Sequence, residues 1–265
     1  MKAIKLTFSL LLSLLITINL VLLQCSYFTN KVFYNYNFYI DKFEKYQLYS
    51  YIQDVAKKNL GSLAKTYNLP ENIFSSIITL DYIKLQVQGA TKGFLNYMLY
   101  KTNNLPYINI NNGVNNANSN VSNSASYTTD LTTIINSQNF QSARAALYRL
   151  YLYKNTLICT LIILSFALLI IKRKDIFSFL IWLACSFMTG GFIAILLSFI
   201  GISSSIVKNI NTGIPNLNLM ITAILKDYFR YFLYCGGILA GMGILVLAAS
   251  LIIKNILFSK KTITS

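Results

Sequence analysis

The sequence predicts an all-α integral membrane protein: a four-helix transmembrane bundle with a helical extracytoplasmic domain inserted between the first and second crossings. Two observations support this fold class. Of the 265 residues, 55% are hydrophobic and only 12% are charged, whereas a soluble domain usually carries about 25% charged residues. In addition, four apolar segments along the chain are close to or above the length needed to cross a bilayer.

The first apolar segment, residues 6–23, follows Lys2 and Lys5. Lysines before an apolar stretch are typical of both a signal peptide and an uncleaved anchor. The residues that follow, Gln24 to Phe28, lack the small-x-small pattern that signal peptidase requires, and the bulky Gln24 disfavours a lipoprotein site. We therefore interpret residues 1–25 as an uncleaved first transmembrane helix, with cleavage as the alternative.

Three further crossings are predicted over residues 156–171, 176–203 and 231–253. The four-residue link at 172–175 forces the second and third crossings into an antiparallel hairpin. Residues 204–230 form an outer amphipathic loop in this prediction. Its helix would open at Pro215 and either lie on the membrane surface, cap the bundle or pack beneath the outer domain.

Basic residues in short flanking segments stay in the cytoplasm, so their positions predict the orientation of the chain. Such residues gather at the N-terminus, in the 172–175 link and in the tail 254–265, which places both termini inside the cell and residues 26–155 outside. The topology-setting residues are Lys2, Lys5, Lys172, Arg173, Lys174 and Lys254.

Residues 26–155 are expected to contain helices and one flexible part. Apolar residues recur at helical spacing over 39–67, and a second helix should start near Pro70 and end near residue 100. Gly89 and Gly93 weaken that second helix, and Thr91 could cap a fresh start between them. The Asn- and Ser-rich stretch 103–136 reads as a flexible segment. A helical stalk over 138–150 then leads into the second crossing.

Small residues in the third and fourth crossings predict close helix packing, because glycine lets two helix backbones approach each other. The fourth crossing contains a GxxxG pattern, which could pack against the third crossing or against a second copy of the chain. The predicted packing residues are Gly190, Gly191, Gly236, Gly237, Gly241 and Gly243.

The residue inventory argues against an enzyme and against a cofactor or metal site. Histidine is absent, no CxxC pair occurs, and no nucleotide-binding or hydrolase motif is present. The net charge of +15 fits an anionic membrane surface, and no nucleic-acid recognition pattern accompanies it. Cys25, Cys159 and Cys235 could form a disulfide, or they could serve as small apolar residues in helices.

No charged residue lies inside the four apolar runs, so an ion or proton relay has no obvious carrier. Neutral polar side chains could line a path, although single hydroxyl groups more often bond back to their own helix. These residues are Thr17, Asn19, Thr160, Ser165, Ser178, Ser186 and Thr189.

Several short elements carry a resemblance to a known group of proteins. They are Val32-Phe33-Tyr34, Phe38-Tyr39, Phe43, Tyr46 and Asp81-Tyr82-Ile83, followed by three C-terminal crossings. In these the chain resembles uncharacterised bacterial integral membrane proteins with one N-terminal crossing, a helical extracytoplasmic domain and three more crossings. The resemblance implies a membrane location and no particular activity.

The order of crossings also resembles the permease subunits of ABC systems of the cell-division and macrolide-export types. The link at 172–175 departs from that pattern, because it is too short to contact an ATPase. The excess of Lys over Arg and the abundance of Asn, Ile and Tyr are typical of an AT-rich bacterial genome.

Our leading hypothesis is a non-enzymatic protein of the cell membrane whose outer domain binds, senses or scaffolds a partner. The alternative is a transport, permease or channel component that works with partner chains. The expected partners are the lipid bilayer and either another membrane protein or a second copy; neither a cofactor nor nucleic acid is expected.

Overall fold

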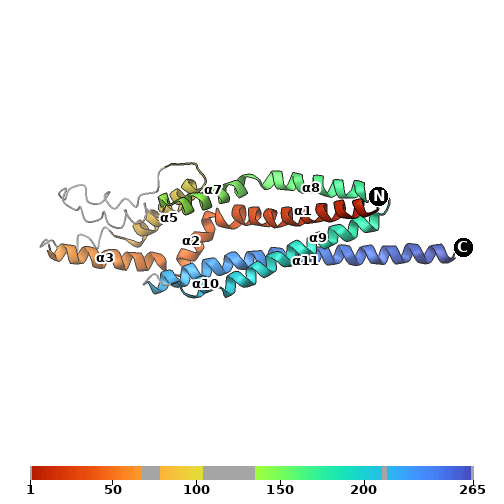
Figure 1. Ribbon diagram of the computed structural model, residues 1–265. Coiled ribbons are helices and arrows are strands. Elements are labelled where there is room, and N and C mark those ends of the chain that lie inside the picture. Colours follow the sequence, from red (N-terminus) through yellow and green to blue (C-terminus); the bar gives the residue numbers. More distant parts are fainter. Residues whose placement is uncertain (1, 67–77, 104–134, 211–213, 264–265) are drawn as a thin grey trace. The chain divides into compact units, whose positions relative to one another are not determined.

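The computed structural model describes residues 2–66, 78–103, 135–210 and 214–263, and every regular element in these ranges is a helix (Figure 1). The all-α prediction is confirmed. The chain divides into two compact units. The membrane unit comprises Met1–Phe33, Leu150–Ile210 and Thr222–Ser265, and the inserted unit comprises Tyr34–Arg149 and Asn211–Ile221.

Four helices in the described residues are long and apolar enough to cross a membrane. They are α1 (Lys2–Phe28), extended by the π-helical turn η1 (Thr29–Phe33), α8 (Lys154–Ile171), α9 (Ile176–Ser203) and α11 (Pro215–Ile263). Large apolar side chains cover their outer surfaces, among them Ile18, Ile163 and Leu245. Serine and other polar side chains are buried between the helices instead. Because this pattern suits a lipid solvent, the protein is an integral membrane protein.

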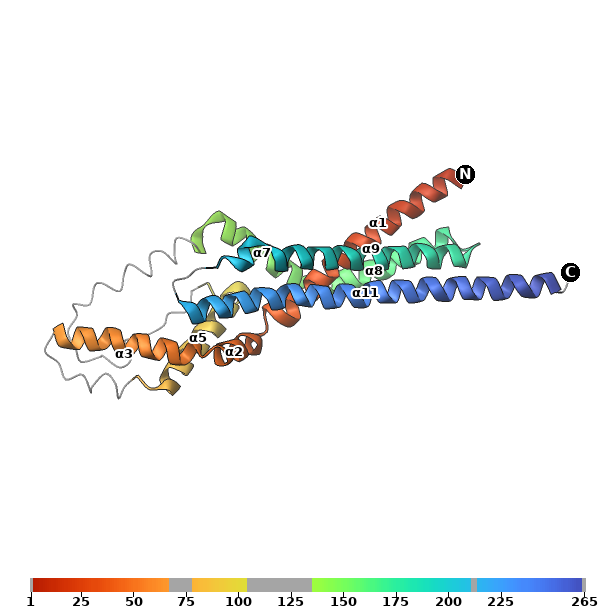
Figure 2. The same ribbon diagram turned by 90° about the horizontal axis from the view of Figure 1, so that it is seen from below.

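The contacts between helices establish their directions. Ser13 of α1 meets Ser186 of α9, and Leu20 meets Gly190, so α1 and α9 are parallel. The positions of Gly191 and Gly243 meet Ala240 and Ala184 respectively, so α9 and α11 are antiparallel. The start of α1, the link between α8 and α9 and the end of α11 therefore lie at one end of the bundle (Figures 1 and 2).

The core of the membrane unit contains side chains from three of these helices. Ile16 and Leu20 of α1, Leu168 of α8 and Leu239 of α11 are buried together. Partly buried leucines and aromatic residues of α8 and α9 pack around them. Helix α1 packs along both α8 and α9.

The predicted amphipathic loop at 204–230 does not exist as a separate element. After the short helix α10 (Ser205–Lys208), α11 begins at Pro215 and continues without a break to Ile263. Proline at the first turn of a helix costs no hydrogen bond, and no further proline follows to stop the helix. With 49 residues, α11 rises about 73 Å, more than twice the thickness of the hydrocarbon core.

The inserted unit contains α2 (Tyr36–Lys45), α3 (Leu48–Thr66), α5 (Leu80–Met98) and most of α7 (Gln138–Leu152). Its predicted first helix, 39–67, is instead divided at Gln47, which has a positive φ of 52°. Tyr49, Ile78 and Ile83 are buried together where α3 meets the start of α5. This cluster gives the inserted unit a small apolar core of its own.

The second predicted helix differs from the structure at its start and at its centre. Thr79 caps the N-terminus of α5 by accepting a hydrogen bond from the Tyr82 backbone N–H at 3.1 Å. Thr91 does not cap a new helix, because its hydroxyl donates to the Val87 carbonyl within a continuous α5. The region around Pro70 and nearly all of the predicted flexible segment lie outside the described residues.

Candidate functional site: the polar face of the first transmembrane helix

The buried surface of α1 and its continuation η1 is largely polar. At the same time leucine and isoleucine side chains of α1 point outward, including Leu10, Leu14 and Ile18. A transmembrane helix with this distribution must be packed by other helices on its polar side, because lipid cannot satisfy these groups. The buried polar residues are Ser9, Ser13, Thr17, Asn19, Gln24, Ser26 and Thr29.

Two serines form a direct polar contact between α1 and α9. The hydroxyl oxygens of Ser13 and Ser186 are 2.7 Å apart, and Ser186 Oγ lies 3.1 Å from the Ser13 carbonyl oxygen. Thr17 donates to the Ser13 carbonyl at 2.9 Å, within α1 itself. The hydroxyls of Ser13, Thr17 and Ser186 therefore have partners, and those of Ser13 and Ser186 fix the register of α1 against α9.

Among the other residues considered as path-lining, the hydroxyl groups of Thr160 and Thr189 bond locally. Thr160 donates to the Thr156 carbonyl and Thr189 to the Cys185 carbonyl, each within its own helix. The backbone N–H of Ser178 donates to the Asp175 carboxylate, which caps α9. Ser165 lies in α8. None of these contacts indicates a path.

Two amide side chains of α1 differ from the hydroxyl groups. Gln24 and Asn19 are 9% and 6% exposed. Neither polar atom of the Gln24 amide, nor Asn19 Oδ1, has a hydrogen-bond partner among the described residues. A polar group without a hydrogen-bond partner costs several kcal/mol in hydrocarbon. This cost is a large part of the net free energy of unfolding of a typical protein. These amides are the most informative polar groups of the bundle.

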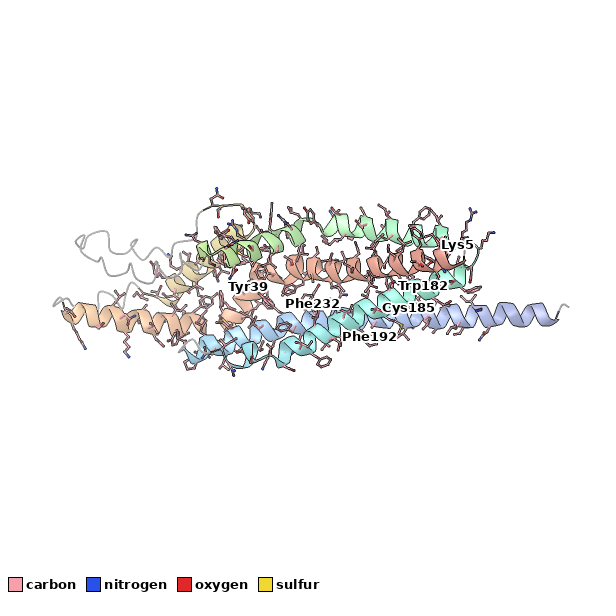
Figure 3. The ribbon with its side chains drawn as sticks, viewed as in Figure 1. Lys5, Tyr39, Trp182, Cys185, Phe192 and Phe232 are labelled. Carbon is pink, nitrogen blue, oxygen red and sulfur yellow. The ribbon has the colours of Figure 1, made fainter. Side chains whose placement is uncertain are left out.

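The two ends of the bundle differ in chemistry. One end, here called the basic end, carries Lys5, the link residues Lys172, Arg173 and Lys174, and Lys254. Lys172 Nζ lies 5.7 Å from the centre of the Trp182 ring, and Figure 3 shows Lys5 and Trp182 at this end. The helix of Lys2 begins here too, although its side chain is outside the described residues. All predicted topology-setting positions are thus at one end.

The opposite end, here called the aromatic end, is a cluster of rings. The centre of the Phe28 ring lies 5.0 Å from the ring centres of both Tyr228 and Phe232 of α11. Gly201 packs directly against the Phe229 ring. Gly201 follows Trp182 by 19 positions in α9, a rise of about 29 Å, which matches a hydrocarbon core of about 30 Å. Aromatic residues at both levels are typical of membrane–water interfaces.

Glycine allows close contact between α9 and α11. A methyl group at Gly191 would lie 2.6 Å from the Ala240 backbone nitrogen, and one at Gly236 would lie 2.8 Å from the Gly191 carbonyl oxygen. A methyl group at Gly243 would lie 2.7 Å from Met188 Cγ, and one at Gly190 would lie 3.5 Å from Leu20 Cβ. This interface therefore depends on the absence of side chains on both helices.

The GxxxG pair itself is not part of that interface. A side-chain carbon at Gly237 or Gly241 would meet nothing within 4 Å. The contact face of α11 instead repeats through Gly236, Ala240 and Gly243, about 100° around the helix from the predicted pair. The prediction that Gly237 and Gly241 pack against the third crossing is wrong, and these two glycines lie on a different face of α11.

The cysteines do not form the considered disulfide: all four are free thiols. In the described residues, no group of three or more Cys, Asp or Glu side chains could hold a metal ion.

The inserted unit contains a buried cation that the sequence did not reveal. Arg144 of α7 is 5% exposed, and its guanidinium lies between the rings of Tyr97 and Tyr100, at 3.6 Å and 3.7 Å from their centres. It donates to the Tyr97 carbonyl and, at 3.4 Å, to Gln141. No acidic side chain within salt-bridge distance is found in the described part of the chain, so the two rings and the carbonyl stabilise the charge.

The sequence contained one weak signal for this arrangement, an arginine in a helix rich in alanine, leucine and tyrosine. Its ring partners come from the end of α5, where Tyr100 has a positive φ of 56° and terminates the helix.

Comparison with known proteins identifies no relative: no family model, no curated protein and no solved structure matches this chain.

Proposed function

We propose that the protein lies in the cell membrane with both termini in the cytoplasm and the inserted unit on the outer side. The gathering of basic residues at one end of the bundle supports this orientation, because short basic segments are retained in the cytoplasm. The inserted unit follows the opposite, aromatic end of α1 along the chain.

Thiol labelling in intact cells tests this orientation. In a variant whose native cysteines are replaced by serine, we expect Lys92→Cys to react with a membrane-impermeant thiol reagent. Arg173→Cys should react only after the membrane is permeabilised. Lys92 is an exposed residue of α5 and Arg173 lies in the link between α8 and α9, so both should be accessible on their own side. The reverse labelling pattern would refute the orientation.

We infer that the function is non-enzymatic and consists in binding a partner, as a receptor or scaffold, through the inserted unit. The observation that supports this is that the unit has its own core and its own buried cation, yet presents an apolar side chain to the surroundings. Leu85 of α5 is 67% exposed, and Gly89 and Lys92 continue its face of the helix. A rigid helical face with one prominent apolar residue is suited to protein recognition.

Photo-crosslinking in living cells tests this function with the full chain. A photoreactive phenylalanine analogue at position 85 should form a discrete adduct with another protein, because the leucine it replaces is exposed at the proposed contact. The same analogue at Lys58, an exposed residue of α3, serves as the control. No adduct at positions 85, 89 or 92, or identical adducts at 58 and 85, would contradict a specific contact on this face.

A transport function is a second candidate, and the unpartnered amide of Gln24 inside the membrane is the observation that favours it. Polar residues within a bundle often mark a solute path. Purified protein in liposomes should then release a small uncharged solute faster than liposomes without protein. Gln24→Leu should slow that release, and equal rates with and without protein would remove this candidate.

A further inference from the structure

The amide of Gln24 has an unmet requirement for hydrogen bonds. Its Nε2 can donate two bonds and its Oε1 can accept two. Both atoms are buried, and neither has a partner among the described residues. In water or in a protein interior such a group is almost always satisfied by protein atoms or by an ordered water molecule. A group other than the described residues must therefore bond to this amide.

The helix register locates the amide within the bundle. Gln24 follows Leu20 by one turn and precedes Phe28 by one turn, so it shares their face of α1. Leu20 contacts Gly190 of the parallel helix α9, which puts Gln24 level with Ala194. On α11, a methyl group at Gly236 would lie 3.0 Å from Ala194 Cβ. The amide is thus level with two of the smallest side chains of the bundle, at a depth where α9 and α11 pack closely against each other, so any molecule that bonds to the amide must be small.

The surroundings restrict the chemistry of that molecule. The apolar runs of the four helices contain no charged residue, so an ion would have no counter-charge. The amide needs a partner that both accepts and donates hydrogen bonds. Water fulfils both roles and is the smallest molecule that does so.

We propose that Gln24 holds ordered water inside the membrane, in a hydrated site between α1, α9 and α11. The site is separate from the serine contact nearer the basic end. Leu20 is 4% exposed and lies between Thr17 and Gln24, so it closes the site on that side. The water therefore belongs to the half of the bundle next to the aromatic end. This inference goes beyond partner binding by the inserted unit and does not depend on it.

Nuclear magnetic resonance of the full-length protein in lipid nanodiscs tests the proposal on the native side chain. With glutamine and leucine labelled by ¹⁵N, the Gln24 side-chain signal is assigned by its loss in Gln24→Asn, or in Gln24→Met if the first variant does not fold. We expect a cross-relaxation peak between this NH₂ group and water. The backbone N–H of Leu22, an outward-facing residue at similar depth, is the negative control and should show no such peak.

Two results would overturn the proposal. One is a Gln24 side chain that shows cross-peaks to acyl-chain or protein protons and none to water. The other is an equal water peak at Leu22, which would mean that the whole helix is hydrated rather than this site. A water peak at Gln24 that is absent at Leu22 would establish the site, whether or not the inserted unit binds a partner.

Discussion

Replacing Gly191 with alanine should separate α9 from α11 and lower the thermal stability of the purified protein in detergent. The added methyl carbon would lie 2.6 Å from both the Ala240 nitrogen and the Gly236 carbonyl oxygen, and 2.9 Å from the Ala240 methyl group. The first two are backbone atoms, so no side-chain rotation relieves the overlap. Overpacking in a well-packed interior typically costs about 1–3 kcal/mol, and leucine should cost more than alanine.

The same helix pair offers a matched control for this experiment. Gly241→Ala adds the same methyl group to α11, where it meets nothing within 4 Å. Its unfolding temperature should remain close to that of the wild type or rise slightly, since alanine favours the helix. Equal unfolding temperatures for Gly191→Ala and Gly241→Ala would show that the α9–α11 contact is not the one described. A loss of stability in Gly241→Ala alone would show that the GxxxG face carries the packing.

Replacing Arg144 with lysine should destabilise the inserted unit although the charge is kept. Lysine lacks the planar group that lies between the rings of Tyr97 and Tyr100, and its single ammonium cannot reach the Tyr97 carbonyl and Gln141 as the guanidinium does. A buried charge that loses its partners costs about 3–5 kcal/mol. Limited proteolysis of the full chain should then cleave α5 or α7 at protease concentrations that leave the wild type intact.

Arg149→Lys is the control for this substitution, because Arg149 lies on the same helix and is exposed. It should leave the proteolysis pattern unchanged. Arg144→Met separates charge from shape, since it removes the buried charge and keeps an extended side chain. If Arg144→Lys resisted protease as well as Arg149→Lys does, the contact with Tyr97 and Tyr100 would contribute nothing to the stability of the unit.

Local composition was sufficient to predict several elements of this fold. Apolar length alone defines a membrane helix, and the third crossing was predicted at 176–203, which are the bounds of α9. The antiparallel hairpin of α8 and α9 follows from a link too short for any other arrangement. The basic flanks also predict correctly which helix ends lie together.

Local patterns do not predict how each helix is rotated about its axis or which distant residues meet; these depend on packing in three dimensions. Gly236 and Gly237 are neighbours in the sequence, yet one contacts α9 and the other contacts nothing. Arg144 finds its ring partners more than forty positions away in the sequence, and the buried state of Gln24 depends on its neighbours in space rather than along the chain. The physical reason is that a mostly apolar helix is apolar on every side, so its sequence does not mark which side faces another helix. Packing between the helices determines that side.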